Sequence, residues 1–132
     1  FHHSAKKVSR TKFLNVKAVY LLFIEILEPK KIEIGALGRI KFQPGTYVYV
    51  GSAMNSVEKR LERHFSEVEN THWHIDYLTA ETKPFDYFIL PESSEYEEWL
   101  AEKLEKYCEP VDGFGSSDSS KSSHLFRIPQ TF

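Results

Sequence analysis

The stretch YVYVGSAMNSVEKRLERHF, residues 47–65, joins a strand pattern to a helix pattern at Gly51. Before Gly51, tyrosine alternates with valine, which is typical of a half-buried β-strand. From 56 to 68 apolar residues recur at helical spacing, and Ser56 or Asn55 is suited to cap that helix. The stretch therefore predicts a strand, a short corner and a helix. The apolar positions of this helix are Val57, Leu61, Phe65 and Val68.

Tyrosines and basic residues of this stretch are predicted to meet beside the core. Alternation places Tyr47 and Tyr49 on one face of the strand. Arg60 and His64 lie one helical turn apart on the same edge of the apolar stripe, whereas Arg63 points away from it. Arg60 and His64 therefore reach one point near the end of the strand. Spacing alone leaves open a surface arginine beside a half-buried histidine that covers the core edge.

The remaining segments mix strands with helices. Strands are expected at 18–27, 30–35, 39–42, 85–90 and 124–128, a helix at 95–108, and a glycine- and serine-rich loop at 113–123. The apolar stripe expected on the later helix consists of Tyr96, Trp99, Leu100, Leu104 and Tyr107. This order predicts an α+β domain with a small, mainly antiparallel sheet flanked by helices.

Composition suits one domain with a modest core. The chain has 132 residues, of which 41% are hydrophobic, and a net charge of −2. A single cysteine, Cys108, cannot form an internal disulfide, no signal peptide is visible, and no apolar run approaches the roughly 20 residues of a membrane span. We therefore expect a cytoplasmic protein.

Charge is distributed unevenly along the chain. We expect residues 1–16 to form a basic N-terminal arm and residues 17–132 to form the domain. The segment 92–109 is rich in glutamate. A basic arm beside an acidic helix fits a phosphate-binding surface opposite a solvated face, and ordinary surface charge is the other interpretation.

Glu97 is the glutamate of the later helix that lies on the flank of its apolar stripe. A carboxylate against the core needs a partner such as a cation or a bound metal. Ser94 and Glu97 also have the spacing of a capping box, in which the glutamate returns to the serine amide. The residues alone leave both interpretations open.

The tyrosine motifs resemble those of a GIY-YIG nuclease domain, a family named for two short strands. The first strand of that family ends in Gly-x-Tyr, which corresponds to AVY at 18–20, and the second in Tyr-x-Gly, which corresponds to YVG at 49–51. YVYVGSA, HWHIDYL, GFGSSD and SHLF together are similar to a subfamily of small, mostly archaeal and bacterial GIY-YIG-like proteins of unassigned function. The resemblance covers about residues 17 to 128.

Three departures accompany the resemblance. Ala18 replaces the glycine of the first motif. The two motifs lie further apart than in the excision-repair nucleases, which predicts an inserted β-hairpin at about 27 to 44. Serines at 119, 120 and 122 stand where the subfamily often has cysteines, which argues against a redox or metal role for that loop.

The resemblance implies hydrolysis of a DNA phosphodiester with one Mg²⁺ or Mn²⁺ ion. Glu97 would hold the metal, and Tyr20 or Tyr49 would orient or deprotonate the attacking water. A tyrosine needs a nearby cation to act as a base at neutral pH, and Arg60 is the candidate. His64 would donate to a phosphate oxygen or carry a proton. The further candidates for substrate binding are Tyr47, Gly51, Ser52, Arg63, His74 and Asp76.

The segment HWHIDYL at 72–78 allows other interpretations. In an extended segment His72, His74 and Asp76 would share one face and could bind zinc or iron, whereas on a helix they would diverge. Alternatively, the apolar residues anchor the segment in the core while the polar ones satisfy hydrogen bonds. The resemblance suggests a third role, in which His74 and Asp76 line the active cleft.

Three functions therefore compete. The first is a divalent-metal-dependent DNA endonuclease of repair or restriction, with RNA as a further possible substrate. The second is a non-catalytic nucleic-acid-binding module on the same fold, consistent with Ala18 and the net charge of −2. The third is a zinc- or iron-site protein built on residues 72–76. The order of preference follows the resemblance.

Overall fold

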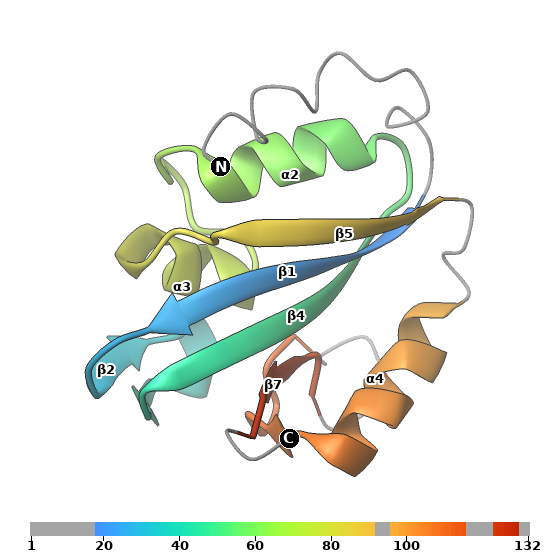
Figure 1. Cartoon of the computed structure of the whole chain (residues 1–132). Helices are drawn as coiled ribbons and strands as arrows, with labels where there is room; N and C mark the ends of the chain where they lie inside the picture. The colour runs from blue at the N-terminus through green and yellow to red at the C-terminus, as the bar shows by residue number, and fades with distance from the viewer. Residues whose placement is uncertain (1–17, 92–95, 116–122, 130–132) are drawn as a thin grey trace.

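The computed structural model describes residues 18–91, 96–115 and 123–129. The predicted basic arm, Ser94 of the predicted capping box, and residues 116–122 of the predicted loop lie outside this part of the chain. Within the described residues, a five-stranded antiparallel sheet has the order β5-β1-β4-β7-β6, and β2 and β3 form a separate two-stranded sheet (Figure 1). The predicted α+β class is therefore confirmed.

The elements follow the predicted order, and helix α3 forms where residues 72–78 had allowed either an extended segment or a helix. They are β1 (Ala18–Ile26), β2 (Lys30–Glu33), the 3-10 turn η3 (Gly35–Leu37), β3 (Arg39–Phe42), β4 (Gly45–Ala53), α2 (Val57–Phe65), α3 (His74–Glu81), β5 (Asp86–Pro91), α4 (Tyr96–Tyr107), β6 (Glu109–Pro110) and β7 (Leu125–Arg127). The short strand β6 has no counterpart among the expected elements.

Strands β1 and β4 form the centre of the sheet. They pair antiparallel over their whole length, with Tyr20 opposite Gly51 and Leu22 opposite Tyr49. The two tyrosine motifs therefore lie side by side. β4 continues through Ser52 and Ala53, so the expectation that this strand ends at Gly51 is short by two residues. These two additional residues carry the chain to the corner before α2.

Alternation along β1 and β4 separates two cores, one on each face of the sheet. On one face, even-numbered residues of β1 and odd-numbered residues of β4 pack with α2 and α3. On the other, Val19, Val48 and Val50 pack with Ala101 of α4 and Phe126 of β7. Figure 1 shows the central strands with α2 above them and α4 below. A site at the end of β4 can thus receive side chains from both faces.

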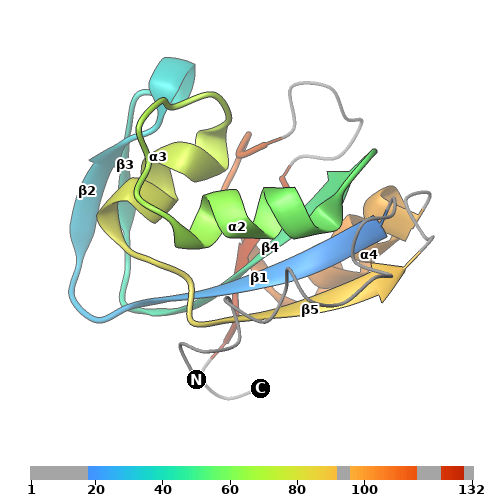
Figure 2. The same cartoon turned by 90° about the horizontal axis from the view of Figure 1, so that it is seen from above.

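The inserted hairpin is present. β2 and β3 pair antiparallel, and η3 forms the turn between them. The hairpin packs beside α3, as Figure 2 also shows, and buries Ile32, Ile34 and Phe42 in the core. The extra residues between the two tyrosine motifs therefore extend the core and support α3.

The predicted apolar stripe of α4 is wrong in part. Tyr96, Trp99 and Tyr107 are exposed, whereas the small side chain of Ala101 is fully buried against the sheet. Leu100 and Leu104, which also belong to the predicted stripe, pack beside it. A small residue at the contact lets a helix approach a sheet closely, and the bulky aromatic rings then fall outside the contact.

The predicted loop at 113–123 begins with a buried residue. Phe114 is completely buried, and its ring packs edge-on against Tyr49 at a centroid distance of 6.3 Å. Gly113 and Gly115 on either side have φ angles of +77° and +69°, which glycine adopts readily. In the described part of the chain, no helix is long and apolar enough to cross a membrane.

Candidate functional site

A buried tyrosine–histidine pair lies at the junction of β1 and α2. The Tyr20 hydroxyl lies 2.6 Å from Nε2 of His64, and neither side chain is exposed to solvent. The Arg60 guanidinium, which can only donate, interacts with the Tyr20 hydroxyl oxygen. We therefore assign the Tyr20 hydrogen to the contact with His64. His64 Nε2 is then the acceptor. The Tyr20–His64 pair thus connects the first tyrosine motif with the basic residues of α2.

Burial keeps His64 uncharged. The pKa of His64 is lowered to about 3, chiefly by burial; Arg60 and Arg63 act in the same direction, and Asp76 acts in the opposite direction. An imidazole with this pKa is neutral at physiological pH and can accept a hydrogen bond from the Tyr20 hydroxyl. The second ring nitrogen, Nδ1, has no hydrogen-bond partner among the described residues.

Both motif tyrosines resist ionisation in this structure. Burial raises the pKa of Tyr20 well above its usual value, with a smaller contribution from Tyr49. Burial also raises the pKa of Tyr49, and Glu97 and Asp76 add to this effect. Arg60 lowers both pKa values, which is the expected direction, but burial exceeds its effect. Neither tyrosine is therefore a free base at neutral pH.

Gly51 leaves the space that the Tyr20 ring occupies. A Cβ atom at this position would lie 2.5 Å from Cζ and 2.6 Å from the hydroxyl oxygen of Tyr20. Real Cβ atoms do not approach other heavy atoms so closely, so any larger residue would displace the ring. The glycine of the Tyr-x-Gly motif thus makes room for the Tyr20 ring and does not form a turn.

Two arginines of α2 flank the exposed ring of Trp73. The Arg60 guanidinium lies 4.3 Å from the Trp73 ring centroid, and the Arg63 guanidinium lies 5.0 Å from it. Arg60 also donates from Nη1 to the carbonyl oxygen of Ser52 at 3.0 Å. The expectation that Arg63 points away is wrong, because Arg63 donates from Nε and Nη2 to both carboxylate oxygens of Asp76.

Glu97 reaches the same strand end from the other face of the sheet. The Ser52 hydroxyl donates to Oε1 of Glu97 at 2.9 Å, and Nδ1 of His124 lies 3.4 Å from Oε2. The two polar groups of Ser52 therefore link Arg60 on one face with Glu97 on the other. We call Ser52, Glu97 and His124 the Glu97 cluster. Because Ser94 lies outside the described residues, the capping-box interpretation of Glu97 stays a prediction.

His124 is the member of this cluster that sequence reasoning missed. It directly precedes β7, and its ring is almost completely buried. Its Nδ1 lies 3.3 Å from the carbonyl oxygen of Val50, and its Nε2 lies 3.8 Å from Oε2 of Glu98. The sequence signal for His124 was its position in SHLF, one of the segments that resemble the subfamily, but no role was assigned to the histidine.

The one group of the Glu97 cluster that suits a hard cation is the Glu97 carboxylate. The described residues contain no group of three or more His, Cys, Asp or Glu side chains that could hold a metal. Glu97 nevertheless offers a carboxylate whose side chain is 28% exposed. Mg²⁺ is often bound through one or two carboxylates, with water and substrate phosphate completing an octahedral shell. Glu97 therefore fits the expected single ion.

The segment 72–78 does not form the extended strand that a zinc or iron site required. It enters helix α3, and Asp76 accepts hydrogen bonds from the backbone N–H groups of His72 and Trp73. Burial favours the neutral form of Asp76, but its hydrogen bonds from Arg63, Trp73 and His72 lower the pKa of the carboxyl overall. Asp76 thus holds the start of α3 and the Arg63 side chain together.

His74 and Tyr47 have structural partners away from the Glu97 cluster. His74 Nδ1 accepts the backbone N–H of Gly115 at 2.8 Å, which ties α3 to the turn around Phe114. Burial lowers the pKa of His74. Tyr47 is buried in the core and donates its hydroxyl to the carbonyl of Gln43. Tyr47 shares a sheet face with Tyr49, as alternation predicted, but its hydroxyl points to the opposite end of β4.

Comparison with protein families places the chain in one family. The model of the family described as domain of unknown function DUF123 matches residues 19–132. The chain therefore belongs to the DUF123 family. Neither the comparison with curated proteins nor the comparison with solved structures gave a match.

Proposed function

We propose that this DUF123 protein is a divalent-metal-dependent endonuclease that hydrolyses phosphodiester bonds in DNA, in repair or restriction. The observation that carries the proposal is the convergence at Ser52. Its carbonyl oxygen binds Arg60 and its hydroxyl binds Glu97, so a cation for phosphate and a carboxylate for metal lie at one strand end. The Tyr20–His64 pair lies beside them, since Arg60 and Glu97 both act on the Tyr20 hydroxyl.

The Tyr20–His64 pair supplies a route for the proton of the attacking water. The Tyr20 oxygen accepts that proton while the Tyr20 hydrogen moves to Nε2 of His64, so no tyrosinate forms. The water oxygen then bonds to phosphorus as the bond to the leaving oxygen breaks, and solvent protonates that oxygen. A phosphate bound at Arg60 would offset the positive charge that helps to lower the His64 pKa.

Arg60 and Glu97 would hold the two other reacting groups. Arg60 presents its guanidinium to the phosphate, where it stabilises the charge that grows in the transition state. Glu97 would bind the cation, which supplies Lewis-acid stabilisation of the leaving oxygen. Ser52 and His124 position the Glu97 carboxylate through contacts to its two oxygens.

The test is cleavage of a labelled panel of duplex, single-stranded, flap and branched DNA, with a matched RNA strand. Each substrate is incubated with Mg²⁺, with Mn²⁺ and with EDTA. We expect metal-dependent cuts from the wild type, a loss of at least about 100-fold in Glu97→Gln, and a comparable loss in Tyr20→Phe. Glu102→Gln on the same helix serves as the matched control and should cleave normally.

A non-catalytic binding module is the second candidate. The burial of Tyr20 and Tyr49 favours it, because both hydroxyls are held in their neutral form. Retardation of DNA by a folded wild-type protein that cuts no substrate with either metal would establish this function and reject the endonuclease. Cleavage that persists unchanged in Glu97→Gln would reject the proposed metal site instead.

A further inference from the structure

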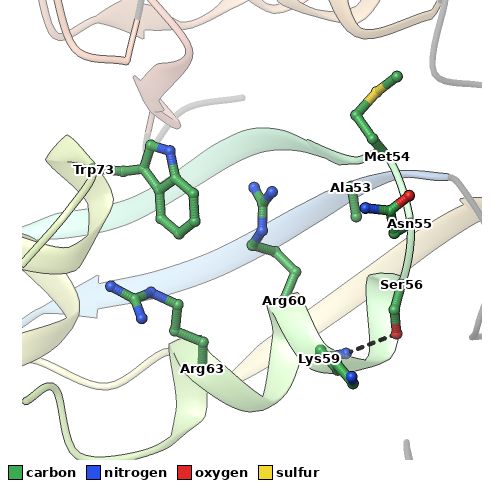
Figure 3. A pocket seen from close by; sticks show the side chains of 8 residues that line it. All are labelled: Ala53, Met54, Asn55, Ser56, Lys59, Arg60, Arg63 and Trp73. Carbon is green, nitrogen blue, oxygen red and sulfur yellow. Dashed lines mark hydrogen bonds between the residues drawn. The ribbon is translucent and has the colours of Figure 1, made fainter. Parts of the chain in front are cut away.

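An open pocket lies beside the candidate site, between the start of α2 and the residue that precedes α3. Its volume is about 390 Å³, within the range of pockets that hold small ligands. The residues that matter for its chemistry are Met54, Lys59, Arg60, Arg63 and Trp73, and we call this the Trp73 pocket. Figure 3 shows the Trp73 ring facing the two arginines, with Met54 on the far rim.

Trp73 is an exposed aromatic platform with a fixed backbone. Its side chain is 38% exposed, although its neighbours Ile75 and Asp76 are buried. The Asp76 carboxylate accepts the backbone N–H of Trp73, and the guanidiniums of Arg60 and Arg63 lie against the ring. A ring held in this way loses little conformational freedom when a flat group stacks on it.

The positive charge of the pocket is only partly compensated. Asp76 forms an ion pair with Arg63, with an N–O distance of 2.8 Å. Within the described ranges Arg60 interacts with the Ser52 carbonyl, the Trp73 ring and the Tyr20 hydroxyl. Tyr20 is held neutral by burial, so none of these three groups carries a negative charge. Lys59 is exposed on the same rim. The positive charges of Arg60 and Lys59 therefore suit the binding of one phosphate next to the indole.

We infer that the Trp73 pocket binds one unpaired nucleotide, with its phosphate on Lys59 and Arg60 and its base against Trp73. The inference rests on the proposed nuclease function and names its substrate class: single-stranded or flapped DNA. In a duplex the bases are stacked on one another and are not available to a side chain, whereas an unpaired base can stack on an aromatic ring. Because Arg60 also binds Ser52, this nucleotide would lie next to the bond that is cut.

Fluorescence of Trp73 tests the inference without requiring cleavage. The chain has two tryptophans, so Trp99→Phe in the full chain leaves Trp73 as the sole indole. This protein is titrated in EDTA with an oligothymidylate, with a duplex of equal length, and with inorganic phosphate. We expect saturable quenching by the single strand and an affinity at least about 10-fold weaker for the duplex, because base–aromatic stacking is lost.

Two substitutions separate stacking from charge, and because Trp73 variants lack the reporting indole, their binding is followed by the anisotropy of a labelled oligonucleotide. Trp73→Leu should weaken single-strand binding about 5- to 50-fold and leave duplex binding unchanged, whereas Trp73→Phe keeps a ring and should recover most of the affinity. Lys59→Ala should weaken both ligands equally and reduce the salt slope of binding by about one. Phe88→Leu, which changes an exposed ring on β5, is the matched control and should change neither affinity.

The outcomes distinguish this inference from the proposed function. Equal quenching by duplex and single strand, or equal loss of both in a folded Trp73→Leu, overturns the unpaired-base site. Full competition by millimolar inorganic phosphate would show a phosphate site without a base site, which also overturns it. Selective binding of the single strand without cleavage would support the unpaired-base site and reject the nuclease. Cleavage that does not change when Trp73 is substituted would support the nuclease and reject the unpaired-base site.

Discussion

The two faces of the central sheet contribute to the candidate site in different ways. On the α2 face, the Tyr20–His64 pair is completely buried, and its two groups contact at 2.6 Å. On the α4 face, Glu97 is partly exposed and its contact with His124 is 3.4 Å long. The Tyr20–His64 pair is therefore part of the hydrophobic core, whereas the Glu97 carboxylate is accessible to solvent and ions.

This difference predicts whether a substitution in each half of the site changes stability, chemistry or both. A change in a buried polar pair leaves unsatisfied groups or a cavity and therefore alters folding and chemistry together. A change in a partly exposed carboxylate alters chemistry while solvent satisfies what is left. Variants of Gly51 and His64 on the α2 face should thus lose stability, and a variant of Glu97 on the α4 face should not.

The largest expected effect is that of Gly51→Ala. The added Cβ would overlap the Tyr20 ring, and the central strand cannot move away because it pairs with β1 and β7. We expect a loss of about 3 kcal/mol in the free energy of unfolding, since overpacking typically costs 1–3 and sometimes more. Urea denaturation followed by circular dichroism measures it. An unchanged midpoint would contradict the close packing of the ring on Gly51.

The next largest effect is the pH dependence of stability caused by His64. Its pKa is about 3 in the folded chain and near 6.5 in the unfolded chain, so the unfolded chain binds the extra proton below pH 6.5. The free energy of unfolding should therefore fall by about 2 kcal/mol from this residue between pH 7 and pH 5. The lowered pKa of His74 contributes with the same sign.

Comparison of the wild type with His64→Gln isolates the contribution of this histidine. The variant should lose most of the decrease between pH 7 and pH 5, because glutamine does not titrate, and His74→Gln is the control for the other histidine of lowered pKa. Denaturation midpoints measured at half-unit pH intervals provide the comparison. Parallel curves for the wild type and His64→Gln would mean that His64 is not held neutral by burial.

The smallest expected effect on stability is that of Glu97→Gln. The amide oxygen can still accept the Ser52 hydroxyl, and the side chain is partly exposed, so the free energy of unfolding should change by less than about 0.5 kcal/mol. Thermal unfolding of the variant beside Glu102→Gln measures this difference. A loss of several kcal/mol would show that Glu97 belongs to the folded core, as the residues of the α2 face do.

Much of the fold follows from short-range patterns. The apolar run at 18–27 and the alternation in β4 predicted both central strands, and the spacing of Arg60 and His64 correctly placed the two on one side of α2. These features depend only on the periods of a strand and a helix, which a sequence displays directly. The inserted hairpin, in contrast, was implied by the family resemblance, through the distance between the two tyrosine motifs.

The remaining features depend on contacts between distant segments. Asp76 accepts the backbone N–H groups at the start of helix α3 while Arg63, from another helix, pairs with its carboxylate. His124 meets Glu97 because β7 pairs with β4 in one register and α4 packs through Ala101. Periodicity within one segment contains no information on such registers, so Ser52 and His124 could not be given their roles in advance.

The tight contact between Gly51 and Tyr20 also predicts how these two positions vary among related chains. Because the two residues are directly opposite in adjacent strands, a side chain at one position takes its space from the other. Homologues with a large aromatic residue at the position of Tyr20 should keep glycine opposite it. Homologues with alanine or serine at the position of Gly51 should carry a shorter residue at the other. The residues at these two positions should therefore covary among related chains.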